Sequence, residues 1–287
     1  MKKHKICKIL LVILAIFLCV AFYELLGICV AYKKQPEVSN TTKKETKNGS
    51  WNECSENTER AVIIEKNPEA LLQRVRLIKN AKKEIILSTF AFQSDESGKL
   101  ILGALHDAAD RGVHIRLLVD GMESWIDMEG NPYFYGLSSH ENVEIKLYNK
   151  ANPLKPWKMM GRMHDKYLIA DGKRYILGGR NTYNYFLGDF PGHKNYDRDV
   201  LVVCDEPEKE NSVNQLLEYF ETIWEQEDSD YFHDNKKLAN RKSVKNAVLE
   251  LQNGYQKYFE ENKERICDTD YTDETFETEK IALVSNP

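Results

Sequence analysis

The longest apolar stretch of the chain lies close to its N-terminus. Residues 9–32 are almost wholly apolar, and Glu24 is the one acidic interruption. At ~1.5 Å per helical residue this stretch would extend roughly 36 Å, which exceeds the ~30 Å hydrocarbon core of a bilayer. The apolar region of a cleaved signal peptide is usually shorter, so the pattern predicts an uncleaved transmembrane anchor over residues 1–33.

The charges on either side of this stretch predict its orientation. Four lysines precede it, at positions 2, 3, 5 and 8, and favour a cytoplasmic N-terminus with the rest of the protein outside the cytoplasm. Five lysines that follow it weaken the asymmetry. Residues 34–58 are rich in Lys, Thr, Asn, Ser and Glu and contain few apolar residues, which predicts a flexible stalk.

From Glu59 onward, short apolar runs alternate with apolar residues at helical spacing. We expect strands at residues 60–65, 84–92 and 113–120. We expect helices that begin at Pro68 and that include residues 100–111, 213–224 and 244–259. Strands separated by helices over short connections indicate an α/β domain over residues 59–266, with a mixed sheet flanked by helices on both faces.

One segment of this domain combines strand patterns with fixed polar positions. Residues 164–181 fit the pattern H-x-K-x4-D-x6-G-G-x-N at every fixed position. Residues 163–170 and 173–177 predict two strands joined by the turn dipeptide Asp171-Gly172, in which Asp171 is structural. Because side chains alternate along a strand, His164 and Lys166 should project to one side and Asp165 to the other.

The fixed residues of this segment suit the chemistry of phosphate esters. His164 is a candidate nucleophile, and Lys166 offers a fixed positive charge to phosphate oxygens. Gly178 and Gly179 allow a backbone to approach a ligand closely, and Asn181 can donate its amide to a phosphoryl oxygen. No cluster of Asp, Glu, His or Cys has the spacing of metal ligands, so the sequence predicts a phosphodiester site without a metal or other cofactor.

The segment resembles the catalytic HKD motif of the phospholipase D superfamily, and its surroundings are most similar to membrane-bound cardiolipin synthases. Residues 89–98 and 108–113 resemble the opening of a cardiolipin synthase repeat, so the resemblance covers roughly residues 85–203. It implies a phospholipase D-like fold and a phosphohistidine intermediate. His164 would be the nucleophile or its acid/base partner, and Lys166 and Asn181 would hold the phosphate oxygens.

The resemblance also implies a carboxylate that bonds the second ring nitrogen of the histidine. Residues 196–200 resemble the family's Trp-Arg-Asp, which identifies Asp199 as the candidate, with an ordinary strand-start aspartate as the alternative. The other histidines do not fit a second motif. We expect His106 on the polar side of a helix and His193 in a loop close to the site in sequence.

The family's chemistry uses two such motifs, and this chain carries one. Residues 59–68 and 279–287 both run from a glutamate and a cation through aliphatic residues to Asn-Pro. This echo predicts that residues 267–287 form an acidic linker and the start of a second repeat, which would supply the second motif. The alternative is a homodimer that places two copies of His164 face to face.

Charge favours a lipid substrate over a nucleic acid. The net charge is −5, whereas nucleic-acid binding relies on Lys and Arg that neutralise phosphates, so nucleic acid is not expected as a partner. Just before His164, residues 149–163 combine cations with apolar residues. Trp157, Lys158 and Arg162 there predict a contact with headgroups or the membrane, and packing on the domain itself is the alternative.

These features predict a single-pass membrane enzyme that acts on phospholipid phosphodiesters. Phosphatidyl transfer, as in cardiolipin synthesis, and hydrolysis share the same intermediate. A nuclease-type phosphodiesterase and a noncatalytic phosphate-binding half-domain are the alternative functions. Of the six cysteines, Cys54 and Cys267 bracket the folded region, where they would either pair outside the cytoplasm or remain free thiols.

Overall fold

The computed structural model describes residues 2–33, 43–44, 59–158, 160–204, 211–233, 235–278, 281 and 283. The chain forms two compact units, one of Met1–Asn48 with Ala151–Arg162 and one of Gly49–Lys150 with Met163–Pro287. Apart from Lys43 and Lys44, the predicted stalk lies outside the described residues, and so does Cys54 of the predicted cysteine pair.

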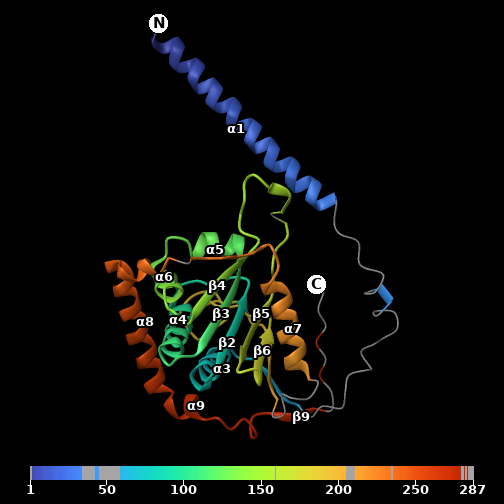
Figure 1. The fold of residues 1–287 in the computed structure, drawn as a ribbon, viewed down its shortest axis with the longest axis vertical. Helices are drawn as coiled ribbons and strands as arrows, with labels where there is room; N and C mark the ends of the chain where they lie inside the picture. Colours follow the sequence, from blue (N-terminus) through green and yellow to red (C-terminus); the bar gives the residue numbers. More distant parts are fainter. Residues whose placement is uncertain are drawn as a thin grey trace. The chain divides into compact units, whose positions relative to one another are not determined.

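The first unit is built on helix α1, Lys2–Lys33 (Figure 1). Its segment His4–Lys33 is long and apolar enough to cross a membrane. Residues 151–162 pack against this helix, and one contact is a hydrogen bond from the Tyr23 hydroxyl to the Leu154 carbonyl oxygen at 2.8 Å. Gly27 lies so close to Pro156 that a Cβ at this position would be 2.3 Å from the proline Cγ. The length and composition of α1 therefore fit the predicted anchor.

The second unit contains a mixed sheet of nine strands among the described residues, in the order β8-β4-β3-β2-β5-β6-β7-β1-β9. Strands β2, β3 and β4 run parallel, and the remaining neighbours pair antiparallel. The strands are β1 (Glu59–Ile64), β2 (Glu84–Thr89), β3 (His114–Asp120), β4 (Val143–Tyr148), β5 (Lys166–Ala170), β6 (Arg174–Gly178), β7 (Asp199–Val203), β8 (Ser229–Tyr231) and β9 (Phe276–Thr278).

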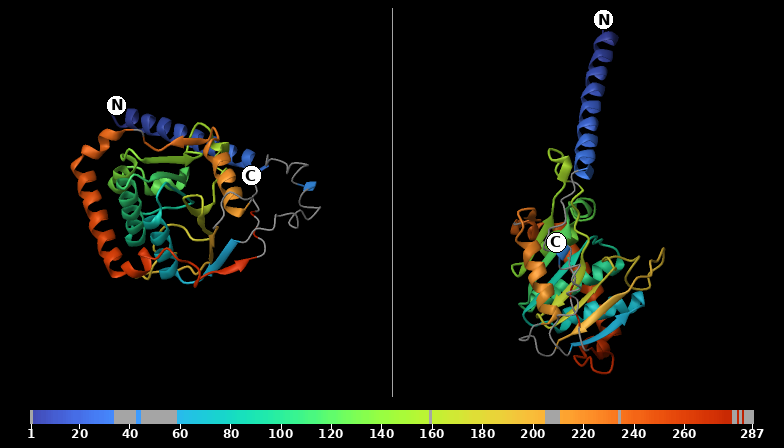
Figure 2. Two further views of the ribbon diagram at one scale, coloured as in Figure 1. Left: turned by 60° about the horizontal axis from the view of Figure 1, so that its bottom comes forward. Right: turned by 90° about the vertical axis from the view of Figure 1, so that its right-hand side faces the viewer.

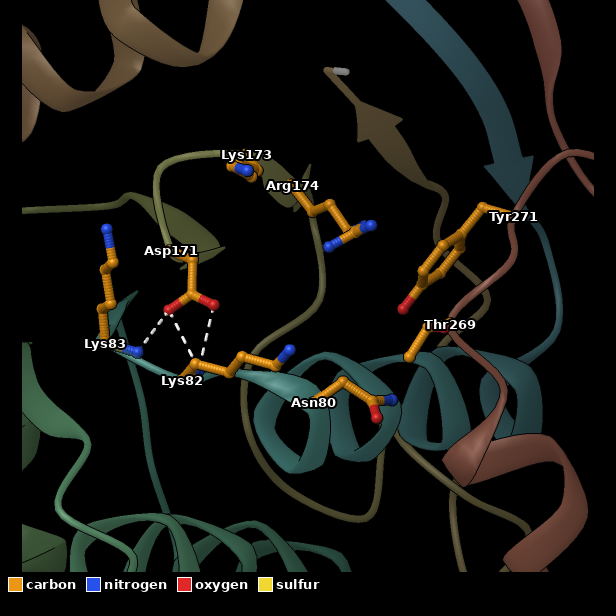
Figure 3. Close-up of a pocket in the computed structure, with 8 residues that line it drawn as sticks. All are labelled: Asn80, Lys82, Lys83, Asp171, Lys173, Arg174, Thr269 and Tyr271. Atoms are coloured by element: carbon orange, nitrogen blue, oxygen red, sulfur yellow. Dashed lines mark hydrogen bonds between the residues drawn. The ribbon is translucent and has the colours of Figure 1, made fainter. Parts of the chain in front are cut away.

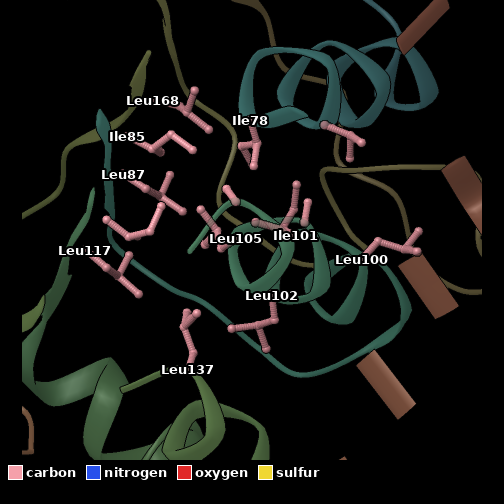
Figure 4. Packing of buried hydrophobic residues seen from close by; sticks show 14 of the residues in the cluster. Ile78, Ile85, Leu87, Leu100, Ile101, Leu102, Leu105, Leu117, Leu137 and Leu168 are labelled. Carbon is pink, nitrogen blue, oxygen red and sulfur yellow. The ribbon is translucent and has the colours of Figure 1, made fainter. Parts of the chain in front are cut away.

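Helices cover both faces of this sheet, as the sequence predicts (Figures 1 and 2). The helices of the unit are α3 (Asn67–Asn80), α4 (Glu96–Asp110), α5 (Gly121–Asp127), α6 (Pro132–Ser138), α7 (Ser212–Trp224), α8 (Lys242–Glu261) and α9 (Lys263–Cys267). Helices α3, α4, α6, α8 and α9 contribute to one apolar cluster, part of which is drawn in Figure 4. Helix α7 contributes to a second cluster on the other face.

The strands divide their side chains between these two clusters. In β2, Ile85 and Leu87 belong to the first cluster and Ile86 belongs to the second. Strand β5 repeats this pattern, with Leu168 in the first cluster and Ile169 in the second. Central strands whose two faces are both buried read as continuous apolar runs, which is the pattern that predicted them.

The described part of the C-terminal segment, which the sequence predicts as an acidic linker, makes several contacts with the domain. Strand β9 pairs with β1 at the edge of the sheet, and Tyr271 is 4% exposed. The buried guanidinium of Arg76 forms ion pairs with Asp268 and Glu274, both at 3.0 Å. Some acidic residues of this segment therefore bind cations of the domain, while most of the segment remains exposed.

The predicted start of a second repeat lies largely outside the described residues. Two residues of the final stretch are described, Ile281 and Leu283, and both pack against the second apolar cluster. The Leu283 amide also donates to the Gln215 side-chain oxygen at 2.8 Å. The second repeat therefore stays a prediction.

Candidate active site

The H-x-K residues lie where β5 begins, beside the end of β2. Thr89 is the register partner of Lys166 in this antiparallel pair, and Phe90 follows Thr89 directly. The Phe90 and His164 rings meet edge to face with their centroids 4.7 Å apart, and the Lys166 Nζ lies 5.3 Å from the Phe90 centroid. Asp165 turns the other way and accepts a hydrogen bond from the Tyr219 hydroxyl at 2.8 Å. His164 and Lys166 therefore share one face.

Lys166 is a buried cation whose charge is weakly compensated. Lys166 is 6% exposed, and its Nζ donates to the His164 carbonyl oxygen at 2.7 Å. Burial lowers the pKa of Lys166 to about 8, against the opposing effect of the Asp165 and Asp197 charges. A buried ammonium that is costly to keep charged gains stability from an anionic ligand.

The two glycines at the end of β6 make room for two aspartates. A Cβ at Gly178 would lie 2.1 Å from Asp199 Oδ1, and a Cβ at Gly179 would lie 2.0 Å from Asp197 Oδ2. From the sequence, glycine is expected at both positions because it lets the backbone approach a ligand closely. The structure adds a second reason, because any larger residue would collide with these carboxylates.

Asn181 connects this segment to the end of β2. It is 7% exposed, and its Oδ1 accepts from the Ala91 amide at 3.2 Å. The Thr182 and Gln93 amides add backbone hydrogen bonds between the two segments. The residues after Thr89 pair with 181–182. Strand β2 therefore ends at Thr89 and not at the predicted residue 92. The bond at Oδ1 fixes which side of the Asn181 amide can donate to a ligand.

Asp199 belongs to a buried ion network. Its fully buried Oδ2 lies 2.9 Å from an Arg74 nitrogen and 3.2 Å from an Arg180 nitrogen. Arg180 also donates to the carbonyl oxygens of Ile64 and Glu65. The network ties the segment after β6 to β1 and α3. The assignment of Asp199 as the partner of the His164 ring stays a prediction.

Asp197 is the acidic residue that sequence reasoning does not single out. It is half-buried beside Gly179, and its charge acts on the pKa of Lys166. Asp197 and Asp199 are two positions apart and so face the same side of an extended segment, which makes the choice between them ambiguous from spacing. Gly178 pairs with Asp199 in the sheet, and the Asp197 side chain lies beside Gly179. This pairing between β6 and β7 is visible only in the structure.

Asp171 stabilises the far end of the motif hairpin. Its carboxylate accepts hydrogen bonds from the backbone amides of Lys82, Lys83 and Glu84 at 2.7 to 3.1 Å. The φ angles of Asp171 and Gly172 are 54° and 62°, as a tight hairpin turn of this type requires. The aspartate therefore joins the β5–β6 turn to the start of β2.

Comparison with known proteins identifies the family. Residues 74–224, more than half of the chain, match the family model described as cardiolipin synthase, phospholipase D-like domain. The chain belongs to the phospholipase D superfamily.

Two longer proteins are among those that are similar to this chain. An uncharacterized protein of Helicobacter pylori is 30% identical over 212 residues, which are 69% of this chain and 39% of that protein. Cardiolipin synthase C of Escherichia coli is 29% identical over 171 residues, 55% of this chain and 34% of that enzyme. This superfamily member therefore spans well under half the length of these relatives.

A solved structure supports the shared fold. Phosphatidylserine synthase of Haemophilus influenzae superposes with a TM-score of 0.50 and 17% sequence identity over 77% of this chain and 48% of that one. At this identity the likeness shows the phospholipase D fold, with a mixed sheet between helices, and nothing about the substrate of this chain.

The basic and apolar loop of this phospholipase D superfamily member lies in the first unit. Trp157, Lys158 and Arg162 fall within residues 151–162, which pack against α1. The loop exposes the side chains of Leu154, Trp157 and Met160, with 77%, 46% and 53% of their surfaces accessible. Its described partner is thus the apolar helix, and contact with headgroups stays a prediction.

Two other histidines have local partners. The ring of His193 is exposed, lies edge-on to Tyr185 and is 2.9 Å from Asn195 Oδ1. The expectation for His106 is wrong. His106 is 7% exposed, and its ring lies against His140 with Nδ1 3.1 Å from Asp110. Helix α4, which carries His106, is buried over a wider part of its surface than its apolar residues predict.

The part of the chain that the structure describes contains no group of three or more His, Cys, Asp or Glu side chains that could hold a metal ion. Cations of the protein are instead available near His164. Lys166 lies beside it, and Arg180 and Arg74 form the buried network behind the Gly-Gly segment.

Proposed function

We propose that this chain is a membrane-anchored phosphodiesterase or phosphatidyltransferase that acts on phospholipids through a phosphohistidine. The observation that supports this most is the placement of His164 and Lys166 on one face, against Phe90, with the lysine buried. A nucleophile beside a desolvated cation is suited to attack on an anionic phosphodiester.

The proposed reaction has two displacements at phosphorus. A ring nitrogen of His164 attacks and forms a P–N bond, and the P–O bond to the leaving alkoxide breaks. The histidine of a second motif gives that alkoxide a proton. It then removes a proton from water or an alcohol, which attacks the phosphohistidine and frees His164. Lys166 and Asn181 hold the phosphoryl oxygens in both steps, and Asp197 or Asp199 provides the carboxylate that orients a ring.

A lipid substrate is favoured by the first unit of the molecule. Helix α1 has the length and composition of a membrane span, and the loop that packs on it exposes large apolar side chains together with Lys155, while Lys158 is half-buried. In the proposed membrane topology, α1 spans the membrane with the N-terminus in the cytoplasm, and the α/β domain lies outside the cytoplasm. The net charge of −5 argues against the nuclease alternative.

The second motif is a required part of this proposal. The longer length of the similar proteins supports a second repeat, and a homodimer would supply the same residues from another copy. A phosphate-binding half-domain without activity is the outcome if neither is present. The mass of the native complex, measured by light scattering, separates the two arrangements.

An assay of the full chain in mixed micelles tests the proposal. The micelles contain phosphatidylglycerol and phosphatidylcholine, and cardiolipin, phosphatidate and choline are measured together. Cardiolipin production indicates transfer, and phosphatidate production indicates hydrolysis. Cleavage of bis-p-nitrophenyl phosphate or DNA without any lipid product would support the nuclease alternative instead.

We expect activity to fall as the pH rises through about 8. Phosphate binding needs the charged form of Lys166, whose pKa is about 8 in the free protein, so the ammonium is lost above that pH. The profile of kcat/KM against pH measures this. Lys166→Arg should remove the alkaline fall, because a guanidinium stays charged. Asp197→Asn should move the fall to lower pH, since the Asp197 charge raises the pKa of Lys166. A wild-type profile that is flat to pH 9.5 would contradict the role of this lysine.

We also expect activity to survive exhaustive chelation. The proposed histidine nucleophile, with Lys166 and Asn181 at the phosphate, performs the work that a metal does in other phosphodiesterases. Treatment with EDTA followed by gel filtration should leave kcat within about twofold of the untreated value. Loss of activity that one added divalent ion restores would reject the histidine mechanism.

A further inference from the structure

A basic pocket lies at the opposite end of the sheet from His164. Its cavity has a volume of about 380 Å³ and lies between the start of β2, the β5–β6 turn and the segment after α9 (Figure 3). Lys83 precedes β2 and Phe90 follows it, and at ~3.3 Å per residue the strand separates them by roughly 20 Å. The pocket is therefore distinct from the candidate active site, although the same hairpin reaches both.

The wall of this pocket carries an excess of positive charge. Its cations are Lys82, Lys83, Lys173 and Arg174. Asp171 is the acidic residue in the wall, and three backbone amides already bind its carboxylate. Among the described residues, none of the four cations forms an ion pair with a carboxylate. Elsewhere in this unit, every described arginine except Arg241 has an acidic partner, namely those at 60, 74, 76, 111, 116, 180, 198 and 265.

Two buried donors in the same wall have no hydrogen-bond partner among the described residues. They are the hydroxyl of Tyr271, a residue that is 4% exposed, and the Nε of Arg174. Figure 3 shows the Arg174 side chain extending toward the Tyr271 ring, and its Cζ lies 5.0 Å from the ring centroid. Buried polar groups are nearly always hydrogen-bonded, so an oxygen-rich ligand would satisfy an existing requirement here.

We infer that this pocket binds a phosphate-bearing anion. A planar guanidinium, flexible ammonium groups and a phenol donor match the charge and the several acceptor oxygens of a phosphate. The volume lies at the lower end of the range for small-molecule sites and accommodates a glycerophosphoryl headgroup as well as a free phosphate ion. Both sources present the same chemistry to the pocket.

Calorimetric titration of the full chain in detergent micelles tests the inference. Every sample carries Lys166→Ala, which weakens phosphate binding at the candidate active site. One titrant is sodium phosphate, and the other is water-soluble dihexanoyl phosphatidylglycerol. The test variants are Lys173→Gln with Arg174→Gln, and Tyr271→Phe. The control is Lys245→Gln with Lys257→Gln, which makes the same change in charge on the exposed side of α8.

Binding should be saturable, and the control should keep the affinity of the parent. The double variant in the pocket should weaken Kd at least about tenfold because it removes two charge-assisted contacts, and Tyr271→Phe should weaken it by about threefold. Binding of phosphate itself identifies a free ion as a sufficient ligand, and binding confined to the lipid identifies a headgroup. Absence of saturable binding, or equal weakening in the control, would overturn the inference.

The readout is independent of the proposed function, because binding is measured in protein that lacks Lys166. The pocket variants, made with Lys166 intact, should also keep kcat on a short-chain substrate within about twofold, since the pocket lies roughly 20 Å from His164. Failure of the enzyme assay would therefore leave the pocket intact as a binding site, and failure of binding would leave the proposed mechanism unaffected.

Discussion

The His164→Ala variant is expected to have no measurable turnover while remaining folded. Loss of an acid/base histidine costs about 10²–10⁴-fold, and loss of a covalent nucleophile costs more. The side chain is exposed and touches the Phe90 ring, so its removal takes little from the core. Product formation and thermal unfolding of the same preparation measure the two effects separately.

His193→Ala is the matched control for this variant. The His193 ring is also exposed and has local partners, Tyr185 and Asn195, so its removal should change kcat by less than about twofold. Retention of more than a tenth of wild-type activity by pure His164→Ala protein would reject His164 as the nucleophile. Equal losses in both variants would indicate a general effect of histidine removal.

The Asp199→Ala variant is expected to be strongly destabilised. The side chains of Arg74 and Arg180 are 4% and 0% exposed, and the variant would leave both guanidinium groups without this carboxylate. Breaking a buried pair by removing one partner costs about 3–5 kcal/mol, which corresponds to a fall in Tm of roughly 10 °C for a domain of this size. Thermal unfolding of the full chain in micelles measures the shift.

An exposed ion pair of the same region gives the comparison. The side chains of Arg198 and Glu65 are 72% and 64% exposed, so Glu65→Gln should cost about 0–1 kcal/mol. If Asp199 instead acts through the His164 ring alone, Asp199→Ala would lose activity with a Tm within about 2 °C of wild type. That result would assign Asp199 to catalysis and exclude the structural role of the network.

The active-site hairpin was predictable because its information is local. Asp171-Gly172 specifies a turn with positive φ, and the alternation of residues 164–166 places His164 and Lys166 on one face. The same holds for the helical stripes at 213–224 and 244–259, which lie in α7 and α8. Each of these features depends on the backbone geometry of a few consecutive residues.

The environment of each acidic residue was not predictable, because it depends on which distant cation approaches it. Spacing makes Asp197 and Asp199 equivalent, and the approach of Arg74 from α3 and of Arg180 commits Asp199 to the ion network. The acidic composition of residues 267–278 predicts a linker, and the cations that pair with its acidic residues are Arg60 and Arg76, far away in the sequence.

The sequence by itself determined the apolar span and the alternation of strands and helices, since these follow from composition and short-range periodicity, and its H-x-K motif with the resemblance to phospholipase D selected the candidate catalytic residues. The tertiary structure decided which carboxylates are neutralised, how deeply Lys166 is buried, and where unpaired cations gather around Tyr271. Burial and ion pairing depend on contacts between segments that are remote in the chain, and one-dimensional patterns carry little information about those contacts.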